Sequence, residues 1–156
     1  MKEKKPFFSI VIPAHNEERY IAETLRCVTL LTYPHDRFEI IVVENASTDR
    51  TLEVCKQFDV RNMKVFSVQT KGVSNARNYG ADTADIETDW ILFLDADTHV
   101  KSTLLDEVAL FLETHEGYTV GAVSVQPLSP SRIVRVIYMA CNFWQGLTKS
   151  HTLLFL

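Results

Sequence analysis

The sequence has few cysteines, and those present form neither a metal-binding motif nor a disulfide framework. Cys27, Cys55 and Cys141 are widely separated, and no two of them form a Cys-x-x-Cys pair. An odd number of scattered cysteines is typical of free thiols in a reducing compartment. The basic start, MKEKK, is not followed by the apolar core of a signal peptide. The sequence therefore predicts a cytoplasmic location.

Long apolar runs and an excess of positive charge are also lacking. No uninterrupted apolar run reaches the roughly 18–20 residues that a membrane-spanning helix needs. The 16 Lys and Arg residues face 20 Asp and Glu residues, which gives a formal net charge of −4. Such a chain has no general attraction for nucleic acid, so no nucleic-acid partner is expected. A phosphate-bearing ligand would need local positive charge at its binding site, from a bound cation or from a few Lys and Arg side chains.

Glycine is scarce, and none follows the first predicted strand at residues 7–13. The chain has five glycines, and the segment after this strand, PAHNEERY, contains none of them. The GxGxxG fingerprint of a dinucleotide-binding dehydrogenase is therefore absent. A Gly-rich basic loop, typical of nucleotidyltransferases, is absent from the same place. Both enzyme classes are disfavoured for this reason.

Strand-like and helix-like segments alternate along the chain. Short apolar runs rich in β-branched residues predict strands at residues 7–13, 38–45, 64–69, 90–97 and 118–127. We expect Asn16 to cap the first helix, Ser47 or Thr48 the second, and Thr103 with Asp106 to form a capping box on the fourth. The β-α-β-α order predicts an α/β protein with a Rossmann-like open, mostly parallel sheet and helices on both faces.

Polar residues cluster where the predicted strands end. The clusters are PAHNE, ENASTD, TKGVSNARN and DAD, one after each of the first four strands. In open α/β sheets, ligands bind beyond the carboxyl ends of the strands, which share one edge. Four polar clusters at a single edge therefore indicate a binding site there.

Asp95 and Asp97 lie one residue apart at the end of the fourth predicted strand. Alternate residues of an extended chain point the same way, with Cα atoms ~6.5 Å apart. Two carboxylates about 6 Å apart repel by roughly 3 kcal/mol at an effective dielectric constant of 20, and a divalent cation reverses that repulsion. Mg²⁺ and Mn²⁺ bind through one or two carboxylates plus substrate phosphates. An isolated pair of this kind is more simply a strand-end cap and an Asx-turn, and the other three clusters favour the metal site.

The chain resembles family 2 glycosyltransferases up to about Val125. The motifs that carry the resemblance are SIVIPAHNE, IIVVENASTD, GVSNARNYGAD and ILFLDADT, in the order and approximate spacing of that family. The resemblance implies a GT-A fold and a metal-dependent, inverting enzyme. It also implies a UDP- or GDP-linked sugar donor, a glycan or lipid-linked acceptor hydroxyl, and Mn²⁺ or Mg²⁺ as cofactor.

The resemblance implies roles for two groups of residues on the nucleobase side. The loop that borders the base and ribose would consist of Pro13, Ala14, His15 and Glu17. Glu44 and Asn45 match an acidic pair, often Asp-Asp, that recognises the base. Asn45 departs from that pair, which leaves the preferred base open because an amide both donates and accepts. Structural explanations also exist: Glu17 in the first turn of a helix, Glu44 as an ordinary strand-end acid, and His15 as a surface residue.

A third group would face the diphosphate and the sugar. By the same resemblance, Lys71, Arg77 and Asn78 flank the pyrophosphate and sugar. Asp95 would hold ribose or sugar hydroxyls, and Asp97 would ligate the metal. Arg77 could instead be a solvated helix residue or pair with Asp82.

No catalytic base is identified in the sequence. The family places it, usually as an Asp, in a C-terminal half, and no match follows Pro127. We therefore expect residues 1–156 to be a single nucleotide-sugar-binding domain, truncated before the acceptor-binding half. The alternative to an enzyme is a nucleotide- and metal-binding module or inactive fragment. The apolar face of a last predicted helix, 131–149, would pack on the protein or, alternatively, contact the inner face of a membrane.

Overall fold

The computed structural model describes residues 4–115, in which strands and helices alternate as predicted. The elements are β1 (Phe8–Ala14), α1 (Ile21–Thr29), β2 (Phe38–Asn45), α2 (Thr51–Lys56), β3 (Met63–Val68), α3 (Val73–Asp82), β4 (Trp90–Phe93) and α4 (Leu104–Thr114). All lie in the first of two compact units, Met1–Thr114. None of these four helices is long and apolar enough to cross a membrane. The strand predicted at 118–127 and the helix at 131–149 lie outside the described residues.

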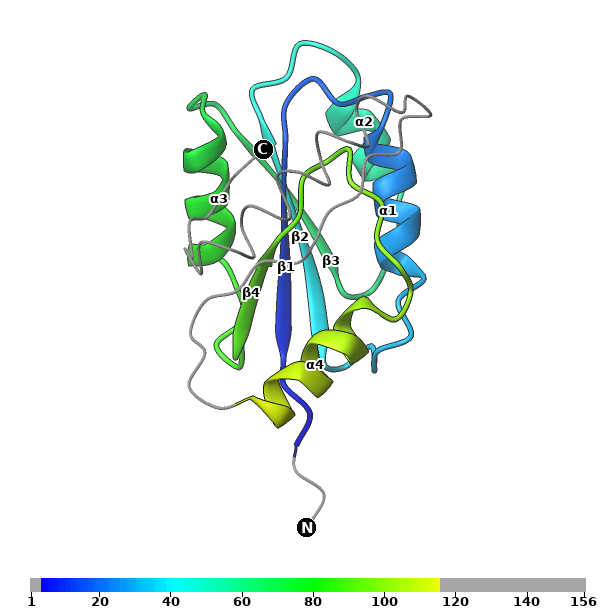
Figure 1. Ribbon diagram of the computed structural model, residues 1–156. Helices are drawn as coiled ribbons and strands as arrows, with labels where there is room; N and C mark the ends of the chain where they lie inside the picture. The colour runs from blue at the N-terminus through cyan, green and yellow to red at the C-terminus, as the bar shows by residue number, and fades with distance from the viewer. Residues whose placement is uncertain (1–3, 116–156) are drawn as a thin grey trace, which may run out of the picture. The chain divides into compact units, whose positions relative to one another are not determined.

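The four strands form one parallel sheet in the order β3-β2-β1-β4 (Figure 1). β1 pairs with β2 along its whole length, from Phe8 opposite Phe38 to Ala14 opposite Glu44. Every residue of β1 and β2 is buried, as expected for central strands covered on both faces. The prediction of an open parallel α/β sheet is confirmed.

Helices cover both faces of the sheet (Figure 1). On one face, α1, α2 and α4 pack against Ile10, Ile12, Ile40 and Val42 of the central strands. On the other face, Ala76 of α3 packs with Val11, Ile41 and Val43. The alternation of residues between the two clusters follows from the two-residue repeat of a strand.

Gly80 allows α3 to lie unusually close to β1. A Cβ atom at this position would stand 2.3 Å from Cγ1 of Val11, which no real contact permits. The glycine lies inside the helix and does not end it, so its role is close packing. The helix that carries Arg77 is therefore fixed directly on the central strand.

β4 is shorter than predicted, because the chain turns after Phe93. Its pairing with β1 ends at Val11 opposite Phe93, apart from one further bond from the Leu94 N–H to the Val11 carbonyl. A turn then follows, in which the Thr98 N–H donates to the Asp95 carbonyl. Pro13 lies beyond this point, so its missing N–H, which would face β4, removes no bond of the sheet.

The predicted caps of the first two helices are wrong. α1 begins at Ile21, and Asn16 adopts φ 58°, outside the helix. Its side-chain oxygen accepts a hydrogen bond from the Thr48 N–H at 2.8 Å. The first turn of α2 receives its bond from Asp49, whose Oδ1 accepts from the Thr51 N–H at 3.0 Å. The polar side chains expected to cap α1 and α2 instead join the loops before them.

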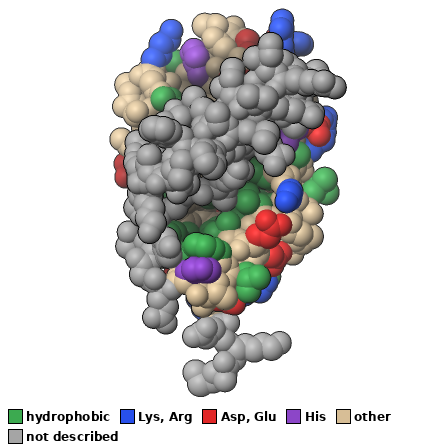
Figure 2. Space-filling view, in the orientation of Figure 1, with side chains coloured by type: hydrophobic (Ala, Val, Ile, Leu, Met, Phe, Trp, Pro, Cys, Tyr) green, Lys and Arg blue, Asp and Glu red, His purple; other side chains and the backbone are tan. Residues whose placement is uncertain are grey.

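The capping box predicted on α4 is also wrong. Asp106 forms an ion pair with Lys5 at 3.0 Å and accepts a bond from the Thr32 hydroxyl at 2.9 Å. The hydroxyl of Thr103 donates to Glu107 instead, at 2.7 Å. Figure 2 shows hydrophobic and acidic side chains next to one another over α4, where Leu110 is exposed. Asp106 thus has long-range partners in place of Thr103, whereas Thr103 keeps a local partner on α4.

Candidate functional site

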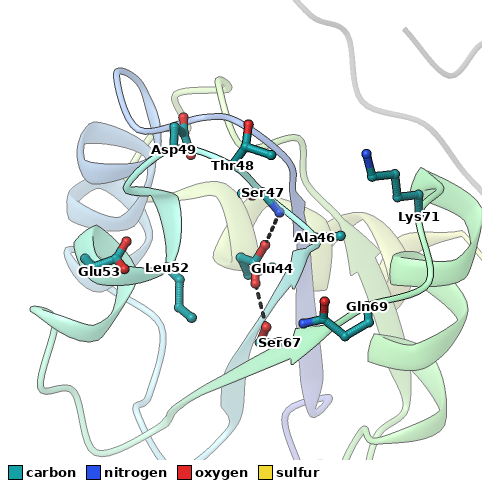
Figure 3. Close-up of a pocket in the computed structure, with 10 residues that line it drawn as sticks. All are labelled: Glu44, Ala46, Ser47, Thr48, Asp49, Leu52, Glu53, Ser67, Gln69 and Lys71. Carbon is teal, nitrogen blue, oxygen red and sulfur yellow. Dashed lines mark hydrogen bonds between the residues drawn. The ribbon is translucent and has the colours of Figure 1, made fainter.

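The four polar clusters lie after the ends of parallel strands, which share one edge of the sheet (Figure 1). A cavity of about 440 Å³ opens there, between the loop after β2 and the loop after β3. Its lining residues are mostly polar: Glu44, Ala46, Ser47, Thr48, Asp49, Leu52, Glu53, Ser67, Gln69 and Lys71. Figure 3 shows Glu44 between Ser47 and Ser67, with the Lys71 side chain on the α3 side.

Glu44 is a buried carboxylate in the wall of this cavity. Its side chain is only 3% exposed, and its two oxygens accept bonds from the Ser47 N–H at 2.5 Å and the Ser67 hydroxyl at 2.6 Å. Burial by itself raises the pKa of Glu44, but the hydrogen bonds from Ser67 and Ser47 outweigh it and lower the pKa below its ordinary value. Glu44 is therefore ionised at neutral pH.

Asn45, the last residue of β2, uses its side-chain amide to hold the loop after β3. Nδ2 donates to the Thr70 carbonyl at 2.6 Å, and Oδ1 accepts from the Gly72 N–H at 2.7 Å. Its backbone carbonyl lies 2.6 Å from Nδ1 of His15, in the loop after β1. The contact of Asn45 with a base stays a prediction, and the observed bonds give it a role in shaping the loop around Lys71.

The loops after β1 and β2 are joined by several hydrogen bonds. The backbone N–H groups of Glu17 and Glu18 donate to Thr51 Oγ1 and Asp49 Oδ2, at 2.8 and 3.1 Å. Asn16 and Ala46, one in each loop, both adopt positive φ, 58° and 51°. Left-handed backbone in a non-glycine residue persists only where surrounding contacts fix it. The loops after β1 and β2 are therefore held to each other next to the cavity.

Asp95 and Asp97 lie beyond the end of β4, in a turn, so the strand repeat that predicts their common direction does not apply to them. Asp97 is exposed and Asp95 is partly buried, whereas Leu94 and Ala96 are buried in the core. The Thr24 hydroxyl of α1 donates to the Ala96 carbonyl at 2.7 Å and anchors the turn. Packing and this hydrogen bond therefore set the direction of both carboxylates.

Arg77 of α3 pairs with Asp95. Its Nη2 lies 2.8 Å from Asp95 Oδ1, and its side chain is only 13% exposed. The two structural alternatives for Arg77, a solvated position or a pair with Asp82, are therefore wrong. The ion pair ties α3 to the end of β4.

Asp97 belongs to a concentration of negative charge at this edge. Burial raises the pKa of the Glu17 carboxyl above its ordinary value, and the nearby charges of Asp97, Asp49 and Asp95 raise it further. Within residues 4–115, no side chain forms an ion pair or hydrogen bond with Asp97. The same part of the chain holds no group of three His, Cys, Asp or Glu side chains that could bind a metal unaided. One or two carboxylates fit Mg²⁺ or Mn²⁺ only together with ligand oxygens.

The structure brings some of the predicted residues together and separates others. Glu44 and Lys71 line one cavity, and Arg77 contacts Asp95. Pro13 and Ala14 are buried at the end of β1, and Asn78 is exposed on α3. Sequence reasoning missed Ser67, which faces Glu44 because the two are register partners in the β2–β3 pair. Only the strand register could have identified it.

The chain is similar to known glycosyltransferases in sequence. The sequence model described as "Glycosyl transferase family 2" matches residues 9–152. The poly(ribitol-phosphate) beta-N-acetylglucosaminyltransferase TarS of Staphylococcus aureus (strain Mu50) is 32% identical over 111 residues, covering 69% of this chain and 19% of TarS. The probable glycosyltransferase YdaM of Bacillus subtilis is 37% identical over 151 residues, covering 90% of this chain and 36% of YdaM. The chain thus spans well under half the length of these two relatives.

Solved structures show the same similarity. Residues 1–349 of S. aureus TarS in complex with UDP superpose with a TM-score of 0.65 at 29% identity, covering 81% of this chain and 43% of that one. The mannosyltransferase PcManGT of Pyrobaculum calidifontis, in complex with GDP-Man and Mn²⁺, gives 0.65 at 26%, covering 80% and 37%. The chain has the GT-A fold and belongs to glycosyl transferase family 2.

Proposed function

We propose that this chain binds the nucleoside diphosphate of a sugar nucleotide at the carboxyl edge of its sheet, and that the protein transfers the sugar to an acceptor hydroxyl with inversion. The observation that carries the proposal is the cavity at this edge, between the loops after β2 and β3, which is lined by ionised Glu44 and cationic Lys71. It is supported by similar solved structures that contain UDP, UDP-GlcNAc, or GDP-Man with Mn²⁺.

Each part of the site has a role in this proposal. The Glu44 carboxylate would accept a hydrogen bond from an N–H of the base, because a carboxylate with neutral donors retains accepting capacity. Lys71 would lie against the diphosphate as a point charge. Asp95, oriented by Arg77, would accept bonds from ribose or sugar hydroxyls. His15 and Glu17 would border the nucleotide from the loop after β1.

The carboxylates after β4 fit a divalent cation that is shared with the diphosphate. Asp97, with Asp95 two residues away in the same turn, offers one or two oxygen ligands. This is the donor set that Mg²⁺ and Mn²⁺ use together with phosphate oxygens. When bound, such a cation would neutralise the charge that develops on the departing diphosphate.

The transfer itself would be a direct displacement. The acceptor oxygen forms a bond to the anomeric carbon as the bond from that carbon to the diphosphate breaks, and the electron pair leaves with the phosphate oxygen. A base must remove the proton of the acceptor hydroxyl. None of residues 4–115 is assigned that role, so binding and transfer are separate claims. A nucleotide- and metal-binding module without transfer is the alternative.

Titration calorimetry of the 156-residue chain with UDP and with GDP tests the binding claim. We expect one of the two to bind, at least about tenfold more tightly with Mn²⁺ than with EDTA, since the cation joins carboxylate and diphosphate. Asp97→Asn should abolish that difference. Asp82→Asn, which removes the same charge from an exposed site on α3, should preserve it.

Unchanged affinity and unchanged Mn²⁺ dependence in Asp97→Asn would contradict the proposed metal site. Incubation of the chain with UDP-GlcNAc and with GDP-Man then separates the two functions. Release of nucleoside diphosphate supports an enzyme, whereas binding without release supports the module.

A further inference from the structure

The side-chain amide of Asn45 is fully engaged with the two residues that flank Lys71. Nδ2 donates to the Thr70 carbonyl at 2.6 Å, and Oδ1 accepts from the Gly72 N–H at 2.7 Å. Asn45 is only 3% exposed, so water cannot readily replace these bonds. One buried side chain thus fixes the backbone on both sides of a lysine that lines the cavity.

Two further features fix the backbone of the loop after β3. The side chain of Asn75 donates to the Lys71 carbonyl at 2.9 Å, from the first turn of α3. Gly72 has φ 129°, which L side chains rarely adopt, and it immediately precedes α3. The backbone from residue 70 to residue 72 is therefore held from β2 and from α3, and the Lys71 side chain extends from a fixed point.

We propose that Asn45 is a positioning residue that directs Lys71 against the diphosphate of the bound nucleotide, and that the two bonds it makes in this chain require an amide. The inference rests on the proposed function. An aspartate could still accept from the Gly72 N–H, but its second oxygen would face the Thr70 carbonyl oxygen at about hydrogen-bond distance with no proton between them. That repulsion would move the loop and with it Lys71.

The test compares UDP with uridine, and GDP with guanosine in parallel, on the wild-type chain and on Asn45→Asp. Lys71 would contact the diphosphate and not the nucleoside. We therefore expect Asn45→Asp to weaken diphosphate binding about tenfold while nucleoside binding changes less than twofold. Lys71→Ala should give the same pattern. The double variant should bind no more weakly than Lys71→Ala, because both changes remove one interaction.

Asn62→Asp is a matched control at the opposite end of the sheet. The Asn62 amide also donates to a backbone carbonyl, that of Phe38, at 3.1 Å. Its substitution should lower the melting temperature while the ratio of diphosphate to nucleoside affinity stays at the wild-type value. If Asn45→Asp does not fold, Asn75→Ala loosens the same loop from the surface, and it should weaken diphosphate binding about threefold.

Three outcomes would overturn the inference for Asn45: equal losses of diphosphate and nucleoside affinity, unchanged diphosphate affinity, or additive losses in the double variant. Each presupposes that the wild-type chain binds a nucleoside diphosphate. If the wild type binds neither UDP nor GDP, the proposed function itself fails.

Discussion

The two ends of strand β2 each carry a buried glutamate. A comparison of these ends distinguishes a carboxylate that stabilises the fold from one that is available to a ligand. Glu39 and Glu44 are 5% and 3% exposed. Each accepts a hydrogen bond from a serine on a neighbouring strand, Ser9 for Glu39 and Ser67 for Glu44, at 2.8 and 2.6 Å. The two carboxylates differ in what else surrounds them.

Glu39 is enclosed by partners that neutralise it. Lys64 forms an ion pair with it at 2.8 Å, and the Asp85 N–H donates to it at 2.6 Å. Glu44 receives only neutral donors and lines a cavity, and no Lys or Arg of the described residues forms an ion pair with it. A buried carboxylate with a cation holds segments together, whereas one with neutral donors beside a cavity retains its charge for a ligand.

The largest effect on stability is expected at the enclosed end. Glu39→Ala would leave Ser9, Lys64 and the Asp85 N–H without their common acceptor and would separate β1 and β3 from the segment before β4. We expect the free energy of unfolding to fall by about 3 kcal/mol, because a buried network loses its centre. Urea denaturation followed by circular dichroism measures this.

A surface glutamate provides the control for this loss. Glu87 pairs with Lys4 at 3.1 Å on an exposed surface, and Glu87→Ala should cost less than about 0.5 kcal/mol. Affinity for UDP or GDP should be unchanged in both variants. A loss of nucleotide binding in Glu39→Ala at temperatures where it remains folded would erase the distinction between the two ends.

At the open end, ligand binding should change more than stability. In Glu44→Gln, an N–H₂ group must face one of the two donors, Ser47 N–H or Ser67 hydroxyl, so we expect a loss of about 1 kcal/mol in stability. Affinity for the preferred nucleoside diphosphate should fall about tenfold, because the charged acceptor for the base is gone. Calorimetry and denaturation of one preparation give both values.

The pH dependence of stability distinguishes the ionised Glu44 from a neutral one. Because its pKa in the folded protein lies below the ordinary value of 4.5, ionised Glu44 adds stability above that pH. This contribution is lost as the pH falls through the folded pKa. The stability difference between wild type and Glu44→Gln should therefore shrink below about pH 4.5. A constant difference from pH 3 to pH 7 would show that Glu44 is not the ionised group.

The sequence predicts which strands form the site better than it predicts the contacts between the side chains of the site. The apolar runs at residues 8–14 and 38–45 indicate buried parallel strands, and the polar residues after them must then share an edge. These inferences need only the repeat of a strand and the handedness of its connections. The same repeat does not fix the directions of Asp95 and Asp97, because the strand ends at Phe93 and a turn begins at Asp95.

The contacts within the site depend on distances that no local pattern contains. Ser67 meets Glu44 through the register of β2 and β3, and Arg77 reaches Asp95 because Gly80 lets α3 lie close to Val11. Asn16 has the residue type and position of a helix cap, but the neighbouring loop supplies a competing partner in Thr48. For Asn16, the Thr48 N–H of the neighbouring loop has taken the place of the helix N–H that a capping side chain would accept.

The smallest expected change tests whether solvent enters the core past Glu44. Cys55 of α2 is fully buried. Burial and the charge of Glu44 raise the pKa of its thiol to about 12. Cys27 of α1 is partly exposed.

At pH 8, iodoacetamide should label Cys27 within minutes and leave Cys55 unmodified, since the thiolate is the reacting form. Peptide mass spectrometry reads both sites, and Glu44→Gln should leave the pattern unchanged because packing, more than the charge, keeps Cys55 protonated. Rapid labelling of Cys55 in the folded wild type would mean that solvent passes Glu44 and reaches the core, and the boundary between binding surface and scaffold would then lie deeper than β2.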